Sequence, residues 1–187
     1  MLAAPLTRVC VFCGSAPGTG AHYVALANDV GTRLAQAGIE VVYGGGRVGL
    51  MGALADAALA AGGSVIGVIP HQLAEREVAH ENLTELYLVD TMHERKARMA
   101  DLSDAFVALP GGFGTFEEFC EVVTWVQLGI IDKPTILVNA DGFYDPLIAM
   151  FDRAHDEGFI SSPNRTIVTV VASVDALLPR LLAHASG

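Results

Sequence analysis

Positive charge is scarce in this sequence of 187 residues. It contains 11 Lys and Arg residues against 21 Asp and Glu residues, which gives a formal net charge of −10 at pH 7. A surface of this sign repels a nucleic acid duplex and an anionic membrane, because both carry dense negative charge. The sequence therefore predicts neither nucleic acid nor membrane as a partner.

Long hydrophobic runs and targeting signals are also missing. No stretch of the sequence reaches the roughly 18 uninterrupted apolar residues that a membrane-spanning helix needs. The first ten residues, MLAAPLTRVC, lack the basic region and the long apolar core of a secretory signal. We therefore expect a cytoplasmic protein.

Cysteine is rare, and its pattern is not that of a reactive site. Cys10 and Cys13 form a C-x-x-C, a spacing known from redox and zinc sites. They lie in the strand-like run RVCVFC, where residues three apart point to opposite faces. We interpret them, and Cys120, as core thiols without disulfide bonds.

Two common nucleotide-binding motifs are absent. The first glycine-rich loop reads G-S-A-P-G-T-G, which departs from the G-x-G-x-x-G of dinucleotide-binding proteins. The second strand ends at Tyr43 before three glycines, with no carboxylate for a ribose diol. No G-K-[ST] occurs either, so neither a nicotinamide dehydrogenase nor a P-loop enzyme is indicated.

Short apolar runs alternate with helical segments along the chain. The runs are nearly continuous in apolar character, as in strands buried on both faces. The alternation favours right-handed βαβ units, so we predict that residues 1–187 form a single Rossmann-like α/β domain, with a doubly wound, mainly parallel sheet and helices on both faces. The predicted strands are 8–13, 40–44, 64–70, 85–89, 105–110, 135–139 and 166–171, and the predicted helices are 20–37, 50–61, 92–102, 115–128, 144–157 and 174–184.

Glycine-rich loops follow several of the predicted strands. Ligands of doubly wound sheets bind at the carboxyl ends of the strands, which here are 13–20, 43–52, 69–73 and 109–115. Any one of these loops is explained equally well by a tight turn. Three that are rich in glycine or small hydroxyl residues at one edge of a sheet favour a nucleotide or phosphosugar site.

The last of these loops, ALPGGFGTFEEF, combines an anion-binding composition with two glutamates. Its glycines let backbone N–H groups approach a phosphate, and the following helix contributes its positive N-terminal end. We expect Glu117 and Glu118 in or near the first turn of that helix. Successive helical residues diverge by about 100°, so the two cannot both face a ligand, and one is expected to be structural.

A basic cluster precedes the strand that leads into this loop. Arg95, Lys96 and Arg98 place three of the eleven basic residues within four positions, and helical spacing puts the two arginines on one face. A solvated helix end is the alternative explanation. In so acidic a chain we interpret the cluster as a clamp for an anionic ligand.

These motifs together resemble a known family. PGGFGTFEE, MHERKARM, GGGRVGLMG and DKP are similar to the cytokinin-activating nucleotide phosphoribohydrolases called "lonely guy" proteins, which are often mislabelled as lysine decarboxylases. The resemblance runs from about Val9 to Ile160. It implies hydrolysis of the N-glycosidic bond of adenine nucleoside 5′-monophosphates, typically N6-substituted, to free base and ribose 5-phosphate. It also implies a homodimer that needs no cofactor and no metal.

The resemblance also implies which residues act. Arg95 and Glu118 would form the catalytic pair. The substrate-binding candidates, from the family motifs and the glycine-rich loops, are Ser15, Gly45, Gly46, Glu77, Lys96, Arg98, Gly111, Gly112, Phe113, Gly114, Thr115, Phe116, Glu117 and Thr124. Thr124 would lie to one side of the helix and could contact a ligand held by a neighbouring subunit.

N-glycoside cleavage gives these residues a physical role. Positive charge grows on the ribose in an oxocarbenium-like transition state, and a fixed carboxylate such as Glu118 stabilises it or orients the attacking water. Arg95 could hold the phosphate or sugar oxygens, or assist departure of the purine. The sequence does not choose among these roles, nor does it decide whether the apolar run 123–131 is a dimer interface or core.

Three other functions fit the sequence less well. A non-catalytic carrier of a nucleotide or phosphorylated cofactor is the main alternative, but mere binding has no need of a carboxylate beside the anion. A pyridoxal phosphate enzyme needs a Schiff-base lysine, and the chain offers only Lys96 and Lys133. His71, His80 and His93 lack metal-ligand spacing and are assigned to the surface or to packing.

Overall fold

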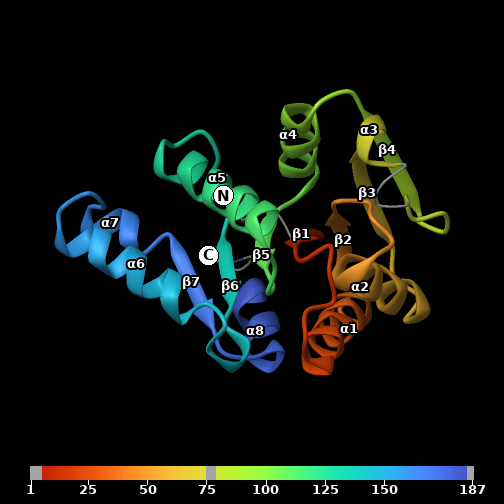
Figure 1. Cartoon of the computed structure of the whole chain (residues 1–187), viewed down its shortest axis with the longest axis horizontal. Coiled ribbons are helices and arrows are strands. Elements are labelled where there is room, and N and C mark those ends of the chain that lie inside the picture. The colour runs from red at the N-terminus through yellow and green to blue at the C-terminus, as the bar shows by residue number, and fades with distance from the viewer. Residues whose placement is uncertain (1–5, 75–78, 185–187) are drawn as a thin grey trace.

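Seven parallel strands form one sheet at the centre of the molecule (Figure 1). The computed structural model describes residues 6–74 and 79–184. Within them the strands lie in the order β4-β3-β2-β1-β5-β6-β7, and each neighbouring pair is parallel. The strands are β1 (Arg8–Phe12), β2 (Glu40–Tyr43), β3 (Val65–Pro70), β4 (Glu85–Val89), β5 (Ala105–Ala108), β6 (Thr135–Val138) and β7 (Val168–Val171).

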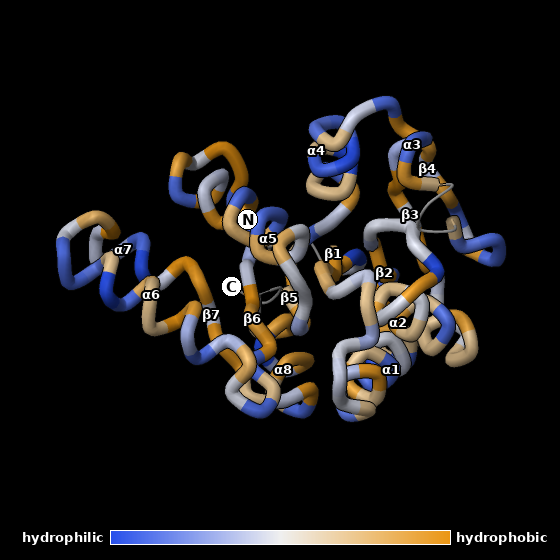
Figure 2. Tube along the Cα trace, in the orientation of Figure 1, coloured by the Kyte–Doolittle hydropathy of each residue, from blue (hydrophilic) through white to orange (hydrophobic). Residues whose placement is uncertain are grey.

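Helices cover both faces of this sheet, which confirms the predicted doubly wound α/β fold. One core cluster joins the sheet to α1, α2 and α8, and a second joins it to α4, α5 and part of α6. Figure 2 shows β6 and β7 as hydrophobic segments between more polar helices. The helices are α1 (Ala21–Gln36), α2 (Gly49–Ala60), α3 (His71–Ala74), α4 (Met92–Leu102), α5 (Phe113–Gln127), α6 (Asp145–Asp156), α7 (Ser162–Arg165) and α8 (Val174–His184), with a 3-10 turn η1 (Ala140–Gly142).

Side chains along and just beyond β1 alternate between the two core clusters. Val11 and Cys13 belong to the cluster under α1 and α2, whereas Cys10 and Phe12 belong to the cluster under α4 and α5. The two cysteines of the C-x-x-C therefore point to opposite faces, as predicted. Both are free thiols, and so is Cys120.

Some element boundaries differ from the prediction. Helix α5 begins at Phe113, two residues earlier than predicted, because Gly112 takes the N-cap position and Gly114 and Thr115 enter the first turn. The sequence analysis missed α3, α7 and η1, since three or four residues are too few to show a periodicity. No helix in the described ranges is long and apolar enough to cross a membrane.

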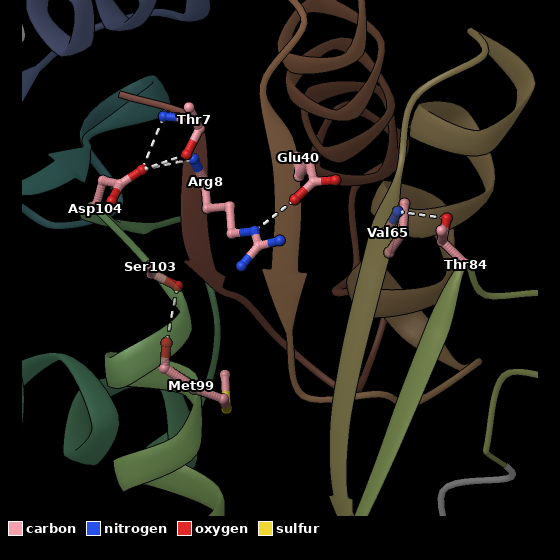
Figure 3. A network of polar contacts seen from close by, with 8 residues as sticks. All are labelled: Thr7, Arg8, Glu40, Val65, Thr84, Met99, Ser103 and Asp104. Atoms are coloured by element: carbon pink, nitrogen blue, oxygen red, sulfur yellow. Dashed lines mark hydrogen bonds and ion pairs between the residues drawn. The ribbon is translucent and has the colours of Figure 1, made fainter. Parts of the chain in front are cut away.

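Polar contacts join the strands at the edge where β1 and β5 begin (Figure 3). Oδ2 of Asp104 accepts hydrogen bonds from the backbone N–H of Thr7 at 2.8 Å, from its hydroxyl at 2.9 Å and from the N–H of Arg8 at 2.9 Å. The guanidinium Nε of Arg8 lies 2.5 Å from a carboxylate oxygen of Glu40 on β2. These contacts fix the amino ends of three strands, and the glycine-rich loops occupy the opposite edge.

Candidate functional site

The reversal of strand order between β1 and β5 places two glycine-rich loops side by side. The chain leaves β1 toward one face and β5 toward the other, and a crevice at such a point is where doubly wound sheets bind ligands. The N–H of Gly14 donates a 3.1 Å hydrogen bond to the carbonyl of Pro110. A Cβ on Gly14 would lie 3.3 Å from Cα of Gly111, so this close approach favours glycine.

Helix α5 presents its N-terminus at this crevice. Its N-cap, Gly112, has no side chain, and the first intrahelical bond runs from the N–H of Phe116 to the carbonyl of Gly112. The N–H groups of the first turn therefore have no helical acceptor and are available to an anion. Phe113 is 92% exposed at the start of the helix, whereas Thr115 is buried.

A cavity of about 210 Å³ opens beside this helix end. The β1–α1 loop, including Ser15, forms one side, and the segment Pro110–Gly112 forms another. Tyr23, Leu50 and Phe143 complete a largely apolar wall. The cavity thus combines backbone amides from two loops with aromatic surface.

Arg95 reaches this edge of the sheet from α4. The helix start is fixed by Thr91, whose hydroxyl accepts a 3.1 Å hydrogen bond from the N–H of Glu94. The guanidinium of Arg95 is buried and donates from Nε to the carbonyl of Val68 and from Nη2 to that of Gly44, both at 3.0 Å. It is therefore anchored to the ends of β2 and β3.

The remaining nitrogen of Arg95 faces Glu118. Nη1 lies 3.7 Å from Oε1 of Glu118, and only 11% of the Glu118 side chain is exposed. The structure thus brings together the two residues that the sequence analysis paired as catalytic. Burial, followed by the negative charge of Glu118, raises the pKa of the Cys13 thiol.

Lys96 forms a separate pair of contacts with α5. Its Nζ lies 2.5 Å from Oε1 of Glu117 and 2.9 Å from Oε2 of Glu121. Burial lowers the pKa of Lys96, but the two carboxylates outweigh burial and the net shift is upward. Glu117 and Glu118 therefore serve different partners, as their divergence along a helix predicts.

Both glutamates lie near the first turn of α5, as predicted, but just beyond it. Because α5 starts at Phe113, Glu117 and Glu118 lie in its second turn, and the first turn holds no acidic residue. The helix dipole acts mainly within the first turn, so it is not what holds these carboxylates in place. Arg95 and Lys96 do so instead.

The structure separates Arg98 from the site that Arg95 forms. The guanidinium carbon of Arg98 lies 4.9 Å from the centre of the Tyr87 ring on β4, and Arg98 is exposed. The prediction placed both arginines on one face of the helix. The two positions are only about 60° apart around the helix, but their side chains diverge: that of Arg95 is bound to the carbonyls of Val68 and Gly44, whereas that of Arg98 lies over Tyr87.

The other candidate residues are more scattered. Gly45 and Gly46 are buried, and both contact the segment at Ala79 and His80. The N–H of His80 donates a 3.1 Å hydrogen bond to the carbonyl of Gly45, and Gly46 forms an antiparallel β-bridge with Ala79. Thr124 is exposed, and its hydroxyl donates to the carbonyl of Cys120 at 2.7 Å. Glu77 lies outside the described residues.

Sequence reasoning missed several residues of this region. Tyr23 and Phe143 line the cavity, Glu121 contacts Lys96, and Tyr144 donates from its hydroxyl to the carbonyl of Leu109 at 2.6 Å. Aromatic residues on unrelated segments carry no local pattern that marks them as neighbours. Among residues 6–74 and 79–184, no group of three or more His, Cys, Asp or Glu is arranged to hold a metal ion.

Comparison with known proteins gives close relatives over nearly the whole chain. A family model described as possible lysine decarboxylase matches residues 51–181. A protein of Oryza sativa subsp. japonica, named a probable cytokinin riboside 5′-monophosphate phosphoribohydrolase, is 51% identical over 174 residues, 93% of this chain and 71% of the relative. Proteins named as cytokinin riboside 5′-monophosphate phosphoribohydrolases are 49% identical in Arabidopsis thaliana, over 93% of this chain and 82% of the relative, and 50% identical in Rhodococcoides fascians, over 91% and 86%.

Solved structures share the fold at lower identity. The molybdenum cofactor carrier protein of Chlamydomonas reinhardtii is 24% identical, with a TM-score of 0.69 over 95% of this chain and 99% of that chain. The molybdenum cofactor binding protein of Rippkaea orientalis is 20% identical, with a TM-score of 0.70 over the full length of both chains. These similarities show the common architecture of the sheet and its helices.

Proposed function

Because the chain belongs to the family of cytokinin riboside 5′-monophosphate phosphoribohydrolases, we propose that it hydrolyses the N-glycosidic bond of N6-substituted adenosine 5′-monophosphates. The products are the free base and ribose 5-phosphate. The observation that carries the proposal is the Arg95–Glu118 pair, which lies beside a helix N-terminus built to bind an anion.

The 5′-phosphate binds at the glycine loop in this proposal. The N–H groups that begin α5 are available to it, and the hydroxyl of Thr115 lies directly beside Gly111. The second turn of α5 carries Glu118, so a ribose attached to the phosphate extends toward that carboxylate. Of the other candidates, Ser15 lines the cavity beside the loop, and Gly45 and Gly46 follow β2 at the same edge of the sheet.

Glu118 acts on the transition state rather than on the bound nucleotide. As the glycosidic bond breaks, positive charge develops on the ribose, and a carboxylate that is already fixed stabilises it without having to reorganise. Arg95 fixes this carboxylate, since two of its own nitrogens are bound to backbone carbonyls. The third nitrogen is shared between Glu118 and the substrate.

Lysine decarboxylation is disfavoured by the contacts of both lysines. A pyridoxal phosphate enzyme needs a lysine whose amine can form a Schiff base. Lys96 is held by Glu117 and Glu121, and Nζ of Lys133 donates to the carbonyl of Ala100 at the end of α4 at 2.8 Å. Both amines serve to hold helices in place.

We further propose that the active form is a cytoplasmic homodimer. Trp125 packs against the core cluster of its own chain, whereas Leu128 and Ile130 at the end of α5 are 64% and 63% exposed. Exposed apolar side chains of this size suit a subunit interface. Light scattering during size-exclusion chromatography should give twice the chain mass, and Leu128→Asp should shift it toward the monomer.

Chromatography of reaction products tests the proposed activity. The protein is incubated with N6-isopentenyl adenosine monophosphate, the matching nucleoside without phosphate, and adenosine monophosphate. We expect release of free base from the monophosphates only, because the nucleoside lacks the group that the glycine loop binds. Recovery of all three compounds intact, with binding still detectable, would instead indicate a carrier of nucleotides.

A further inference from the structure

The connection between β6 and α6 contacts the glycine loop from the neighbouring strand, on the face of the sheet that α5 covers. Tyr144 lies at the end of this connection, with 1% of its surface exposed. Its hydroxyl donates a 2.6 Å hydrogen bond to the carbonyl of Leu109, 35 positions away in the sequence. Leu109 directly follows β5 and directly precedes Pro110, where the glycine loop starts.

This bond completes a set of three that guide the chain out of β5. The N–H of Leu109 donates to the carbonyl of Phe12 at 2.9 Å, and the carbonyl of Pro110 accepts from the N–H of Gly14 at 3.1 Å. Both of these are backbone bonds to the neighbouring β1 segment. The bond to the carbonyl of Leu109 comes from the side chain of Tyr144, so a substitution can remove it without changing the backbone.

The ring of Tyr144 also contacts the far end of the loop. It meets the ring of Phe116 edge-on, with centres 6.2 Å apart and planes at 71°. Phe116 closes the first turn of α5 through its bond to the carbonyl of Gly112. Tyr144 therefore touches the residue before the glycine loop and a residue after it.

Tyr144 is itself held rigidly. Oδ1 of Asn139 accepts a 2.7 Å hydrogen bond from the N–H of Tyr144, and Nδ2 of Asn139 donates to Asp145 at 2.7 Å. The ring of Phe143, which lines the cavity, packs edge-on against Tyr144 with centres 4.9 Å apart. Burial raises the pKa of the Tyr144 hydroxyl, so it stays a donor throughout the neutral pH range.

We propose that Tyr144 is a positioning residue that holds the glycine loop in its anion-binding conformation and thereby sets the affinity for the 5′-phosphate. It acts through the loop backbone and not by touching the substrate. The inference rests on the proposed function for the identity of the anion. Its direct consequence is affinity for phosphate, which can be measured without turnover.

The test compares two variants that each remove one buried hydroxyl donor to a backbone carbonyl. Tyr144→Phe removes the bond to Leu109. Thr135→Val removes a 2.9 Å bond from the Thr135 hydroxyl to the carbonyl of Ile167, at the opposite edge of the sheet. Binding of inorganic phosphate is measured by calorimetry, and KM and kcat are measured with the nucleoside monophosphate that turns over fastest.

We expect Tyr144→Phe to weaken phosphate binding and to raise KM about 3- to 10-fold, the range that corresponds to one buried hydrogen bond, with little change in kcat. Thr135→Val should lower the melting temperature without either effect. Asn139→Ala, which frees the backbone of Tyr144 but keeps its hydroxyl, should weaken phosphate binding in the same direction.

Several outcomes would overturn the inference. Unchanged phosphate affinity in Tyr144→Phe, an equal loss in Thr135→Val, or a fall in kcat at constant KM would each make Tyr144 merely structural or assign it another role. Failure to detect phosphate binding by the unmodified protein would also overturn it. If the protein binds phosphate but cleaves no nucleotide, the proposed function fails, and the phosphate affinities still decide the role of Tyr144.

Discussion

Glu117 and Glu118 illustrate how one step along a helix separates two tasks. The side chain of Glu117 is 54% exposed and pairs with Lys96, whereas that of Glu118 is 11% exposed and faces Arg95. A carboxylate removed from water interacts more strongly with a nearby charge, because the local dielectric is low. Glu118 is therefore the better placed of the two to stabilise positive charge on a sugar.

Replacement of Glu118 by glutamine tests this role. The amide keeps the size of the side chain but removes its charge. We therefore expect a loss of about 2–4 kcal/mol of transition-state stabilisation, which corresponds to a fall in kcat of roughly 30- to 1000-fold. Binding of adenosine monophosphate, measured by calorimetry, should persist. Glu117→Gln should lower turnover far less. Undiminished turnover in Glu118→Gln would remove the central argument for the proposed chemistry.

Replacement of Arg95 by lysine tests geometry at constant charge. An ammonium cannot reach Val68, Gly44 and Glu118 together, so we expect a loss of about 1–3 kcal/mol in unfolding free energy and a marked fall in kcat/KM. Urea titration and steady-state kinetics measure the two effects. Arg98→Lys, which alters an exposed contact with Tyr87, should cost less stability, and equal losses in the two variants would contradict this account.

At the scale of elements, the strands and long helices were predictable because their signals are local. Strands buried on both faces give short, continuous apolar runs, and all seven predicted runs contain a strand. The start of α5 was placed too late because glycine and threonine are weak helix formers, whereas the free helix end at Gly112 decides the boundary.

The candidate site was predictable only where a motif carried it. Arg95 and Glu118 were paired by their motifs, and the structure places them 3.7 Å apart. The contact of Lys96 with Glu121 depends on how α4 lies against α5, and the bond from Tyr144 to Leu109 spans 35 positions. Such contacts depend on tertiary packing, which no window of sequence displays.

Asp104 joins the starts of β1 and β5, and its contribution to stability depends on pH. Burial raises the pKa of Asp104, but the N–H groups of Thr7 and Arg8 and the hydroxyl of Thr7 outweigh burial, so the net shift is downward from 3.8. A lowered pKa in the folded state adds stability above pH 3.8, and this stability is lost as the pH falls through the folded value.

We therefore expect Asp104→Asn to lower the unfolding free energy by about 1–2 kcal/mol at pH 7, because three hydrogen bonds to a charge become weaker. The difference from the unmodified protein should shrink below pH 3.8. Urea titrations between pH 7 and pH 3 measure it. The exposed Asp101 provides the control Asp101→Asn, and a difference that stays constant down to pH 3 would contradict the assignment.

For the whole molecule, the sheet is covered on both sides, so several ionisable side chains are buried within the two core clusters. Burial raises the pKa of the thiols of Cys10 and Cys13 and of the hydroxyls of Tyr43 and Tyr144. The unfolded chain ionises these groups at their ordinary values of 9.0 and 10.0, while the folded chain keeps them neutral. Their contribution to stability is complete below those values and is lost as the pH rises beyond them.

Tyr43 allows this alkaline loss to be isolated. Its hydroxyl is buried and has no hydrogen-bond partner within the described part of the chain, so Tyr43→Phe should change stability little at pH 8. Above pH 10 the unmodified protein should lose about 1.4 kcal/mol per pH unit through Tyr43 alone, a loss that the variant avoids. Urea titrations at pH 8 and pH 11 measure the unfolding free energy of both proteins. Between these two pH values, the unfolding free energy of Tyr43→Phe should rise by about 1 kcal/mol relative to that of the unmodified protein. Parallel losses in the two proteins would show that Tyr43 ionises as readily in the folded chain as in the unfolded one.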